Sequence, residues 1–248
     1  MEEQERPPEK KAPRDAANWA GRVDKLHVSG VSPEALNLNV EGRRVLSPLQ
    51  GFGQMWQKTY RVRLPRSVAT PEVVISTWKE RYGEFWPKGN RFYAPLTGIR
   101  PGEVGVINAT QGPMRLSTGV LVIYSDDTSF TFMTPEGHPF AGWITFSAHG
   151  EGEDLTIAQA QLLLRPGDPI YEMGFKMFGS RTEDKMWQHT LTALASALGA
   201  PGEVETEIVC VDRRRQWSQF GTLRHNAIFR TTLGAPVRSI RRLARPRR

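Results

Sequence analysis

The chain has 248 residues, of which 39% are hydrophobic, and its formal net charge is +7. It has no run of about 18 apolar residues, which excludes a membrane-spanning helix, and the polar N-terminus lacks the apolar stretch of a secretory signal. The single cysteine, Cys210, excludes an internal disulfide and any multi-cysteine metal site, and it favours a reducing, cytoplasmic setting.

The first fifty residues show no regular pattern. Residues 1–20 are rich in Glu, Lys, Arg and Pro, and such a composition buries too little apolar area to offset the entropy lost on ordering. Residues 21–51 mix isolated apolar residues with Gly and Pro. We therefore expect residues 1–50 to be a disordered or irregular segment, whose second half packs against the domain that follows.

The first regular pattern predicts a strand and then a short helix. Over residues 57–64, Tyr60, Val62 and Leu64 alternate with polar residues, which is the period of a half-buried strand. Thr70 and Pro71 then suit the N-cap and the first position of a helix. Behind them, apolar residues recur at helical spacing over about three turns, namely Val74, Ile75, Trp78 and Tyr82.

The middle of the chain predicts an antiparallel meander. Residues 84–103 are aromatic and rich in turn residues, and both a short helix and an ordered loop remain open for them. From 103 to 165, five short apolar runs are separated by turn-forming residues, as in a series of hairpin-linked strands. In the last run, the small residues Ala158 and Ala160 leave room on the inner face of the sheet.

A long helix is predicted after the meander. Asp168 and a following proline begin it, the sequence allows a kink at Gly179–Ser180, and Gly199 ends it. Residues 204–211 then suit a final strand. The apolar residues of the helix predict a single stripe, formed by Ile170, Met173, Met177, Met186, Trp187, Leu191, Leu194 and Leu198.

Together these elements predict an α+β domain over residues 51–202, with a curved antiparallel sheet of six to seven strands wrapped around the long C-terminal helix. A twisted sheet that closes on one helix leaves a wedge, and methionine and aromatic side chains in the wedge suit an apolar ligand. For Tyr124 and Trp143, plain core packing is the alternative. The candidate ligand-binding residues are Tyr124, Phe130, Phe132, His138, Trp143, Met173, Met177 and Trp187.

The last part of the predicted meander, residues 133–166, also resembles a known family. The stretch MTPEGHP at 133–139, followed by GWITF at 142–146 and LRP at 164–166, resembles the START-related, polyketide-cyclase-like superfamily, whose helix-grip fold is shared with birch-pollen allergens. The resemblance covers about residues 55–200 and leaves out both ends of the chain. Members bind lipids, sterols, polyketides or plant hormones, and some are cyclases. The resemblance implies the fold and an apolar ligand, and it assigns no catalytic residue.

His138 is the strongest candidate for chemistry. It follows Gly137 in a predicted turn, where it could act as a general base or a ligand partner, or simply bond to the backbone. The sequence contains no phosphate-binding loop, dinucleotide motif, serine nucleophile elbow or zinc-ligand spacing. We therefore expect no cofactor, no metal and, apart from His138, no catalytic residue.

The C-terminal segment, residues 203–248, is predicted to be a final strand and an arginine-rich tail. Residues 212–248 contain eleven arginines, no lysine and one acidic residue, so the rest of the chain sums to −3. Arg238, Arg241 and Arg242 lie in a weak amphipathic pattern and are the candidate anion-binding residues. Such a tail could bind nucleic acid, dock on an anionic membrane, or serve only to solubilise the protein.

Three functions follow from these patterns. The first is a binding or carrier protein for a hydrophobic small molecule or lipid held between the sheet and the long helix. The second is an enzyme of the cyclase or hydratase type that uses His138. The third is an interaction protein that binds an anionic membrane or nucleic acid through its arginine-rich tail. The absence of catalytic motifs favours the first.

Overall fold

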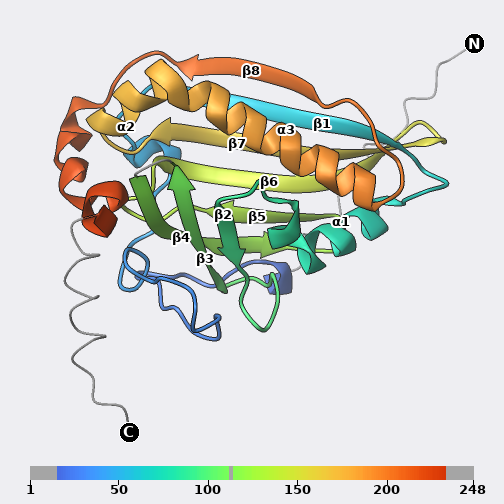
Figure 1. Ribbon diagram of the computed structural model, residues 1–248, viewed down its shortest axis with the longest axis horizontal. Helices are drawn as coiled ribbons and strands as arrows, with labels where there is room; N and C mark the ends of the chain where they lie inside the picture. The colour runs from blue at the N-terminus through green and yellow to red at the C-terminus, as the bar shows by residue number, and fades with distance from the viewer. Residues whose placement is uncertain (1–15, 112–113, 233–248) are drawn as a thin grey trace, which may run out of the picture.

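The computed structural model describes residues 16–111 and 114–232, and within them one eight-stranded antiparallel sheet forms the centre of the molecule (Figure 1). The strand order is β2-β3-β4-β5-β6-β7-β1-β8, and the sheet stays open with β2 and β8 at its edges. The strands are β1 (Met55–Pro65), β2 (Asn90–Tyr93), β3 (Val104–Gln111), β4 (Met114–Ser125), β5 (Ser129–Met133), β6 (Phe140–Glu151), β7 (Leu155–Pro166) and β8 (Glu205–Asp212).

The predicted helix-grip fold class is confirmed, with one strand more than the six to seven expected. The additional strand is β2, which comes from the aromatic segment that the sequence left open and which pairs with β3. A strand of four residues between Gly and Pro carries too little alternation to be recognised from sequence. The predicted final strand is β8, and it pairs with β1 on the side opposite to β7.

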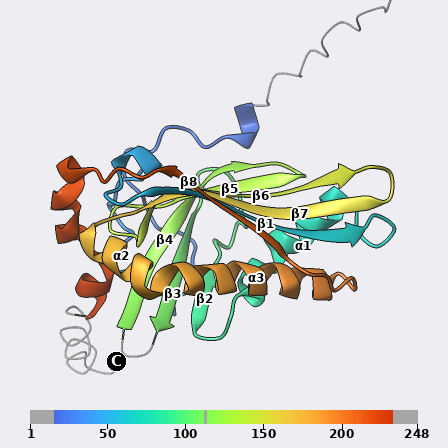
Figure 2. The ribbon, with the colours of Figure 1, turned by 90° about the horizontal axis from the view of Figure 1, so that it is seen from above.

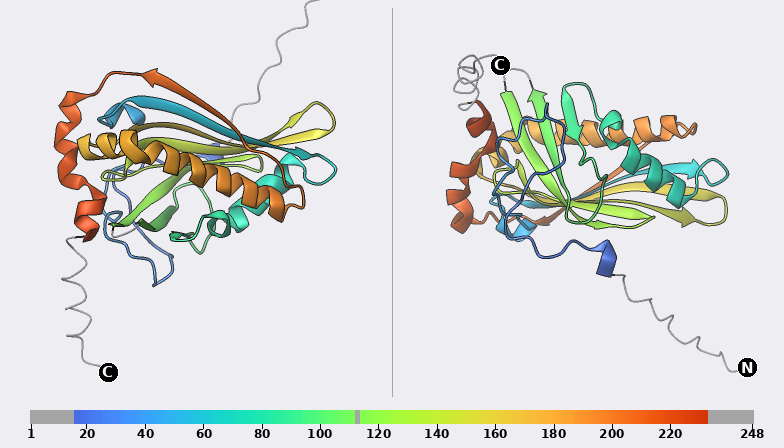
Figure 3. Two further views of the ribbon diagram at one scale, coloured as in Figure 1. Left: turned by 45° about the horizontal axis from the view of Figure 1, so that its top comes forward. Right: turned by 90° about the horizontal axis from the view of Figure 1, so that it is seen from below.

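One layer of helices covers the inner face of the sheet. Helix α1 (Pro71–Glu80) begins at Thr70, whose side chain accepts a hydrogen bond from the Val73 N–H, and the 3-10 turn η3 (Tyr82–Phe85) continues it. Trp78 of α1 is fully buried, and its ring contacts that of Phe146 on β6. Figures 2 and 3 show α1 and the longer α3 on the same side of the sheet.

The predicted long helix is divided into three pieces. Helix α2 (Pro169–Gly174) leads into the π-helical turn η4 (Phe175–Gly179) and then into α3 (Ser180–Ala197). A π turn holds more residues than an α turn, so it rotates the faces of α2 relative to those of α3. Trp187, Leu191 and Leu194 therefore face the sheet, whereas the side chains of Met173 and Met177 lie exposed. The predicted single stripe holds only along α3.

The N-terminal segment crosses the outer face of the sheet. After the 3-10 turn η1 (Ala16–Asn18), it forms a bridge between Trp19 and Tyr124, and it ends in the turn η2 (Pro48–Gln50). Leu26 and Val40 build a small second core with Val104 and Leu121 of the sheet. This segment lies opposite the helices in Figure 2.

Residues 213–232, here called the C-terminal arm, lie at one end of the sheet (Figure 1). The arm contains the 3-10 helix η5 (Trp217–His225) and helical residues 227–232. Asn39 of the N-terminal segment donates to the Thr231 hydroxyl over 3.0 Å and accepts from Arg230 over 3.0 Å. The two ends of the described chain are therefore bound to each other.

Two predictions fall outside this description. Residues 1–15, the first part of the segment expected to be disordered or irregular, are not among the described residues, and neither are the candidate anion-binding residues Arg238, Arg241 and Arg242. None of the described helices combines the length and the apolar character that crossing a bilayer requires.

Candidate functional site

A cavity of about 180 Å³ lies between the inner face of the sheet and α3. Its walls are mostly apolar side chains, including Phe92, Val120 and Leu162 from three strands. Leu116 of β4 and Met186 of α3 also line it and are only half buried. Its volume is similar to that of an engineered cavity of ~150 Å³ that binds benzene.

Four of the predicted ligand-binding residues line this cavity, namely Phe132, His138, Trp143 and Trp187. Phe130 does not line it and instead belongs to the solid core. Its ring is fully buried and stacks on Phe146 at a centroid distance of 4.7 Å.

The other three predicted residues lie elsewhere. Tyr124 is on the outer face, where its ring meets that of Trp19 at a centroid distance of 4.7 Å. A shallow pocket there also includes Trp143, which therefore borders both faces of the sheet. Met173 and Met177 are on the outer surface beyond the π turn and do not line the cavity.

A buried ionic cluster at the cavity wall was not predicted from the sequence. The ammonium of Lys58, a fully buried residue on β1, lies 2.9 Å from Glu183 Oε2 and 2.7 Å from Asp184 Oδ1. The Tyr60 hydroxyl donates to the same Asp184 oxygen over 2.6 Å. Of this cluster, Glu183 lines the cavity and offers it a carboxylate.

Burial governs the protonation of this cluster. It raises the pKa of the Glu183 carboxyl, while the neighbouring Lys58 charge acts in the opposite direction. Burial, followed by the charge of Glu183, raises the pKa of Tyr60 well above its ordinary value, so its hydroxyl stays protonated and donates. Two carboxyl groups share the Lys58 ammonium ion. Glu183 has further oxygen lone pairs, which can accept a hydrogen bond from a guest.

The sequence does carry a signal for this cluster. Lys58 lies two residues before Tyr60, in phase with the apolar residues of its strand. Glu183 precedes Trp187 by four residues and therefore lies on the apolar stripe of α3. A charged residue in an apolar phase is costly to bury unless it is paired, so each position pointed to a partner on another element.

His138 reaches the cavity from the turn before β6. Its Nδ1 lies 3.0 Å from both the backbone N and the carbonyl O of Phe140, so this ring nitrogen is bonded to the backbone. Burial lowers the pKa of the His138 ring to about 4, so the imidazole is neutral at pH 7. His138 is half buried and is one of the residues that line the cavity. Both hydrogen bonds described for the ring are made by Nδ1 and not by Nε2.

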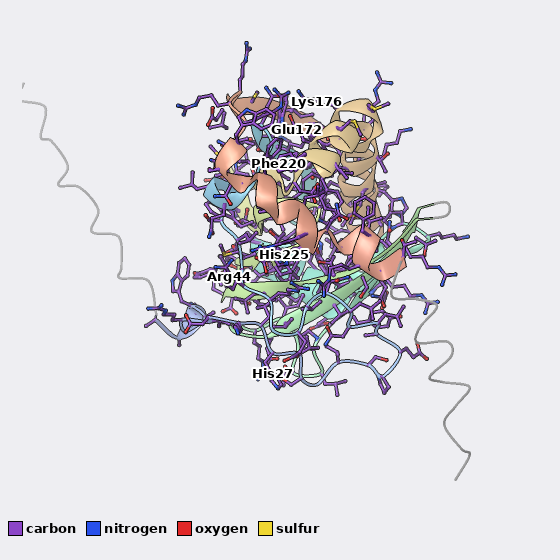
Figure 4. All side chains as sticks on the ribbon, turned by 90° about the vertical axis from the view of Figure 1, so that its left-hand side faces the viewer. His27, Arg44, Glu172, Lys176, Phe220 and His225 are labelled. Carbon is purple, nitrogen blue, oxygen red and sulfur yellow. The ribbon has the colours of Figure 1, made fainter. Side chains whose placement is uncertain are left out.

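The C-terminal arm holds the turn that carries His138. The Ala227 N–H of the arm donates to the Gly137 carbonyl over 3.0 Å, and from the end of β7 the Gly167 N–H also supports the turn by donating to the Pro139 carbonyl over 2.8 Å. Next to the turn, Glu136 lies 3.5 Å from His225. Figure 4 shows His225 of the C-terminal arm and Arg44 of the N-terminal segment at the same end of the sheet. These contacts join residues that are distant in the sequence.

Comparisons with known proteins add a likeness of fold. No protein-family model matches the sequence, and no curated protein matches it. A START superfamily protein from Mycobacterium smegmatis is 21% identical over 59% of this chain and 98% of that chain, with a TM-score of 0.42. The di-domain ARO/CYC StfQ from the steffimycin biosynthetic pathway is 8% identical over 58% of this chain and 50% of that chain, with a TM-score of 0.44.

A third solved structure, Ara h 8.0201, is 13% identical over 57% of this chain and 97% of that chain, with a TM-score of 0.38. The fold assignment itself rests on the strand order and the helix of this chain.

Proposed function

We propose that the protein binds a small, mainly apolar molecule with one polar group, held in the cavity between the sheet and α3. The observation that carries the proposal is the cavity of about 180 Å³, whose walls are apolar except at a few points that include Glu183 and His138. Pockets of this composition gain affinity from buried apolar area and orientation from a few polar groups. The volume suits a guest with one or two rings.

The two polar groups offer complementary contacts. Glu183 presents carboxylate oxygen, which accepts a hydrogen bond from a hydroxyl or N–H of the guest. His138 presents Nε2 from the turn before β6. Glu183 already accepts from Lys58, and a guest with a donor adds a further hydrogen bond to this charged group, which is worth about 1.5–3 kcal/mol. A larger lipid would need the half-buried side chains of Leu116 and Met186 to move aside.

The neutral state of the His138 ring makes a catalytic function the less favoured alternative. A general base works best when its pKa lies near the working pH. The pKa of His138, lowered to about 4 by burial, makes the ring a weak base at pH 7. A neutral ring of this kind suits a hydrogen-bonding role in binding, and the cyclase or hydratase function with His138 as base stays the second candidate.

A pair of isosteric probes tests the proposal. Indole and indene have nearly the same size, and only indole carries an N–H. We expect calorimetry to show that both bind, and that indole binds roughly tenfold more tightly because it donates to Glu183. In Glu183→Gln this preference should shrink, while a melting curve confirms that the variant is folded.

The cavity itself is tested by filling it. Ala109 lines the cavity, whereas its neighbour Thr110 is exposed. Ala109→Phe should abolish binding of both probes, and Thr110→Phe should leave it unchanged. If neither probe binds the wild-type protein, or if Ala109→Phe binds as well as Thr110→Phe, the cavity is not a binding site.

A further inference from the structure

A second surface lies outside the cavity, at the end of the molecule where α2 meets η5. Four large apolar side chains are exposed there: Met173 by 59%, Met177 by 62%, Trp217 by 69% and Phe220 by 51%. These four residues are called the α2–η5 face below. Exposed apolar side chains that gather on one surface mark a site of contact with another phase or molecule.

The contacts beneath these side chains place the two elements that carry them next to each other. Trp217 and Phe220 both pack on the buried ring of Phe52, at centroid distances of 5.3 and 6.4 Å. Glu172 of α2 accepts from Arg215 over 3.1 Å and lies 3.3 Å from the Lys176 ammonium, which ties the start of η5 to the methionine-bearing helix. Figure 4 shows Phe220, Glu172 and Lys176 at the same end of the molecule.

The rim of this face is strongly basic. The exposed residues Arg213 and Arg214 lie just before η5, and the exposed Lys176 follows α2. Residues 213–232 contain five arginines and no acidic residue. Glu172 pairs with Lys176 and Arg215, and Asp212 pairs with Arg165 and Arg214, so each of these two acidic groups is shared by two basic ones and the basic residues remain in excess.

We propose that the α2–η5 face docks on an anionic bilayer surface. Tryptophan and phenylalanine insert at the level of the lipid headgroups, methionine adds apolar depth, and the long basic side chains reach the phosphates from the rim. Basic side chains near an anionic surface are attracted to it, and this attraction weakens as salt is added. The exposed methionines favour a lipid phase over nucleic acid, because base stacking needs aromatic rings rather than thioethers.

The test is vesicle flotation of the full chain, with phosphatidylcholine vesicles that contain or lack phosphatidylserine. We expect binding to the anionic vesicles only, weakened by added salt. The double variant W217S/F220S should bind them at least roughly tenfold more weakly, since each ring loses its buried apolar area. The double variant M173Q/M177Q should weaken binding through the neighbouring helix. Leu96→Ser is the matched control, because Leu96 is also exposed, by 84%, but lies in the loop after β2.

Melting curves establish that each variant is folded, and the two double variants act through different elements, so a defect in one of them does not decide the outcome. Anionic-vesicle binding that persists unchanged in both double variants would overturn the proposal. So would equal binding to neutral vesicles, or a W217S/F220S variant that loses affinity for single-stranded RNA while it keeps its affinity for vesicles.

Discussion

The side-chain amide of Asn226 donates a hydrogen bond of 2.7 Å to the carboxylate of Asp168, and each of the two residues caps a helix. Asp168 accepts from the backbone N–H groups of Ile170 and Tyr171 at the start of α2. Asn226 accepts from those of Ile228 and Phe229 at the start of the last described helical residues. The pair thus connects the C-terminal arm to the domain through two N-caps.

Replacing Asn226 by Ala should lower the free energy of unfolding by about 2–3 kcal/mol, because it removes a cap and also a bond to a buried carboxylate. Burial already raises the pKa of Asp168, and losing the Asn226 hydrogen bond raises it further. Thr70→Ala is the matched control, since it removes only the surface cap of α1 and should cost about 1 kcal/mol. Urea unfolding measures both, and equal costs would show that the link between the caps contributes nothing.

Replacing Gly137 by Ala should loosen the C-terminal arm. Gly137 has φ +90°, and a Cβ there would lie 2.2 Å from the His225 carbonyl oxygen, so the arm backbone must shift. Gly152 also has positive φ, at +63°, but a Cβ on it meets nothing within 4 Å. We expect Gly152→Ala to cost about 1–2 kcal/mol from backbone strain alone.

Limited trypsin digestion reports on the arm directly. Gly137→Ala should expose the arginines of residues 213–232 to cleavage well before the sheet is digested, whereas Gly152→Ala should be cleaved as slowly as the wild type. Equal cleavage rates in the two variants would mean that the turn does not hold the arm.

Replacing Lys58 by Met should cost about 3–5 kcal/mol, because it leaves Glu183 and Asp184 without their shared ammonium ion. Lys88→Met is the control, since Lys88 is exposed and a surface change of this kind is worth at most about 0.5 kcal/mol. Thermal unfolding at pH 7 compares the two variants. The double variant Lys58→Met with Glu183→Gln should recover part of the loss, and no recovery at all would argue against a coupled cluster.

The His138 ring should make stability depend on pH. Its pKa is about 4 in the folded protein and about 6.5 in the unfolded chain, so the unfolded state binds a proton first as the pH falls. The stability that the neutral ring contributes is therefore complete above pH ~6.5 and is lost as the pH falls from ~6.5 to ~4. The loss amounts to about 2–3 kcal/mol at pH 4.5.

Urea unfolding at pH 7.5 and 4.5 tests this dependence. His138→Gln should lose less stability than the wild type between the two pH values, by that amount. His189→Gln, which changes an exposed histidine on α3, should behave as the wild type. A wild-type protein and a His138→Gln variant with the same pH dependence would show that the ring is not buried in its neutral form.

Much of the fold could be predicted because its signals are local. The alternation around Tyr60, the proline after Thr70 and the step from Trp187 to Leu191 each describe a few neighbouring residues, and the structure contains the strand and the helices that they predict. The site was predicted less completely. Phe132, His138, Trp143 and Trp187 line the cavity, but Met173 and Met177 do not, because the π turn between them and α3 leaves no clear trace in the apolar spacing.

By itself, the sequence determined the half-buried strands, the caps that begin α1 and α2, and the apolar face of α3, since side-chain periodicity and capping depend on residues within a turn or two. Only the tertiary structure decided that Lys58 meets Glu183, which is 125 residues away, and that residue 227 supports the turn that carries His138. A buried charge requires a partner, but its own neighbourhood in the chain does not say which distant element supplies that partner, because pairing is settled only when the sheet curves and the helices close over it.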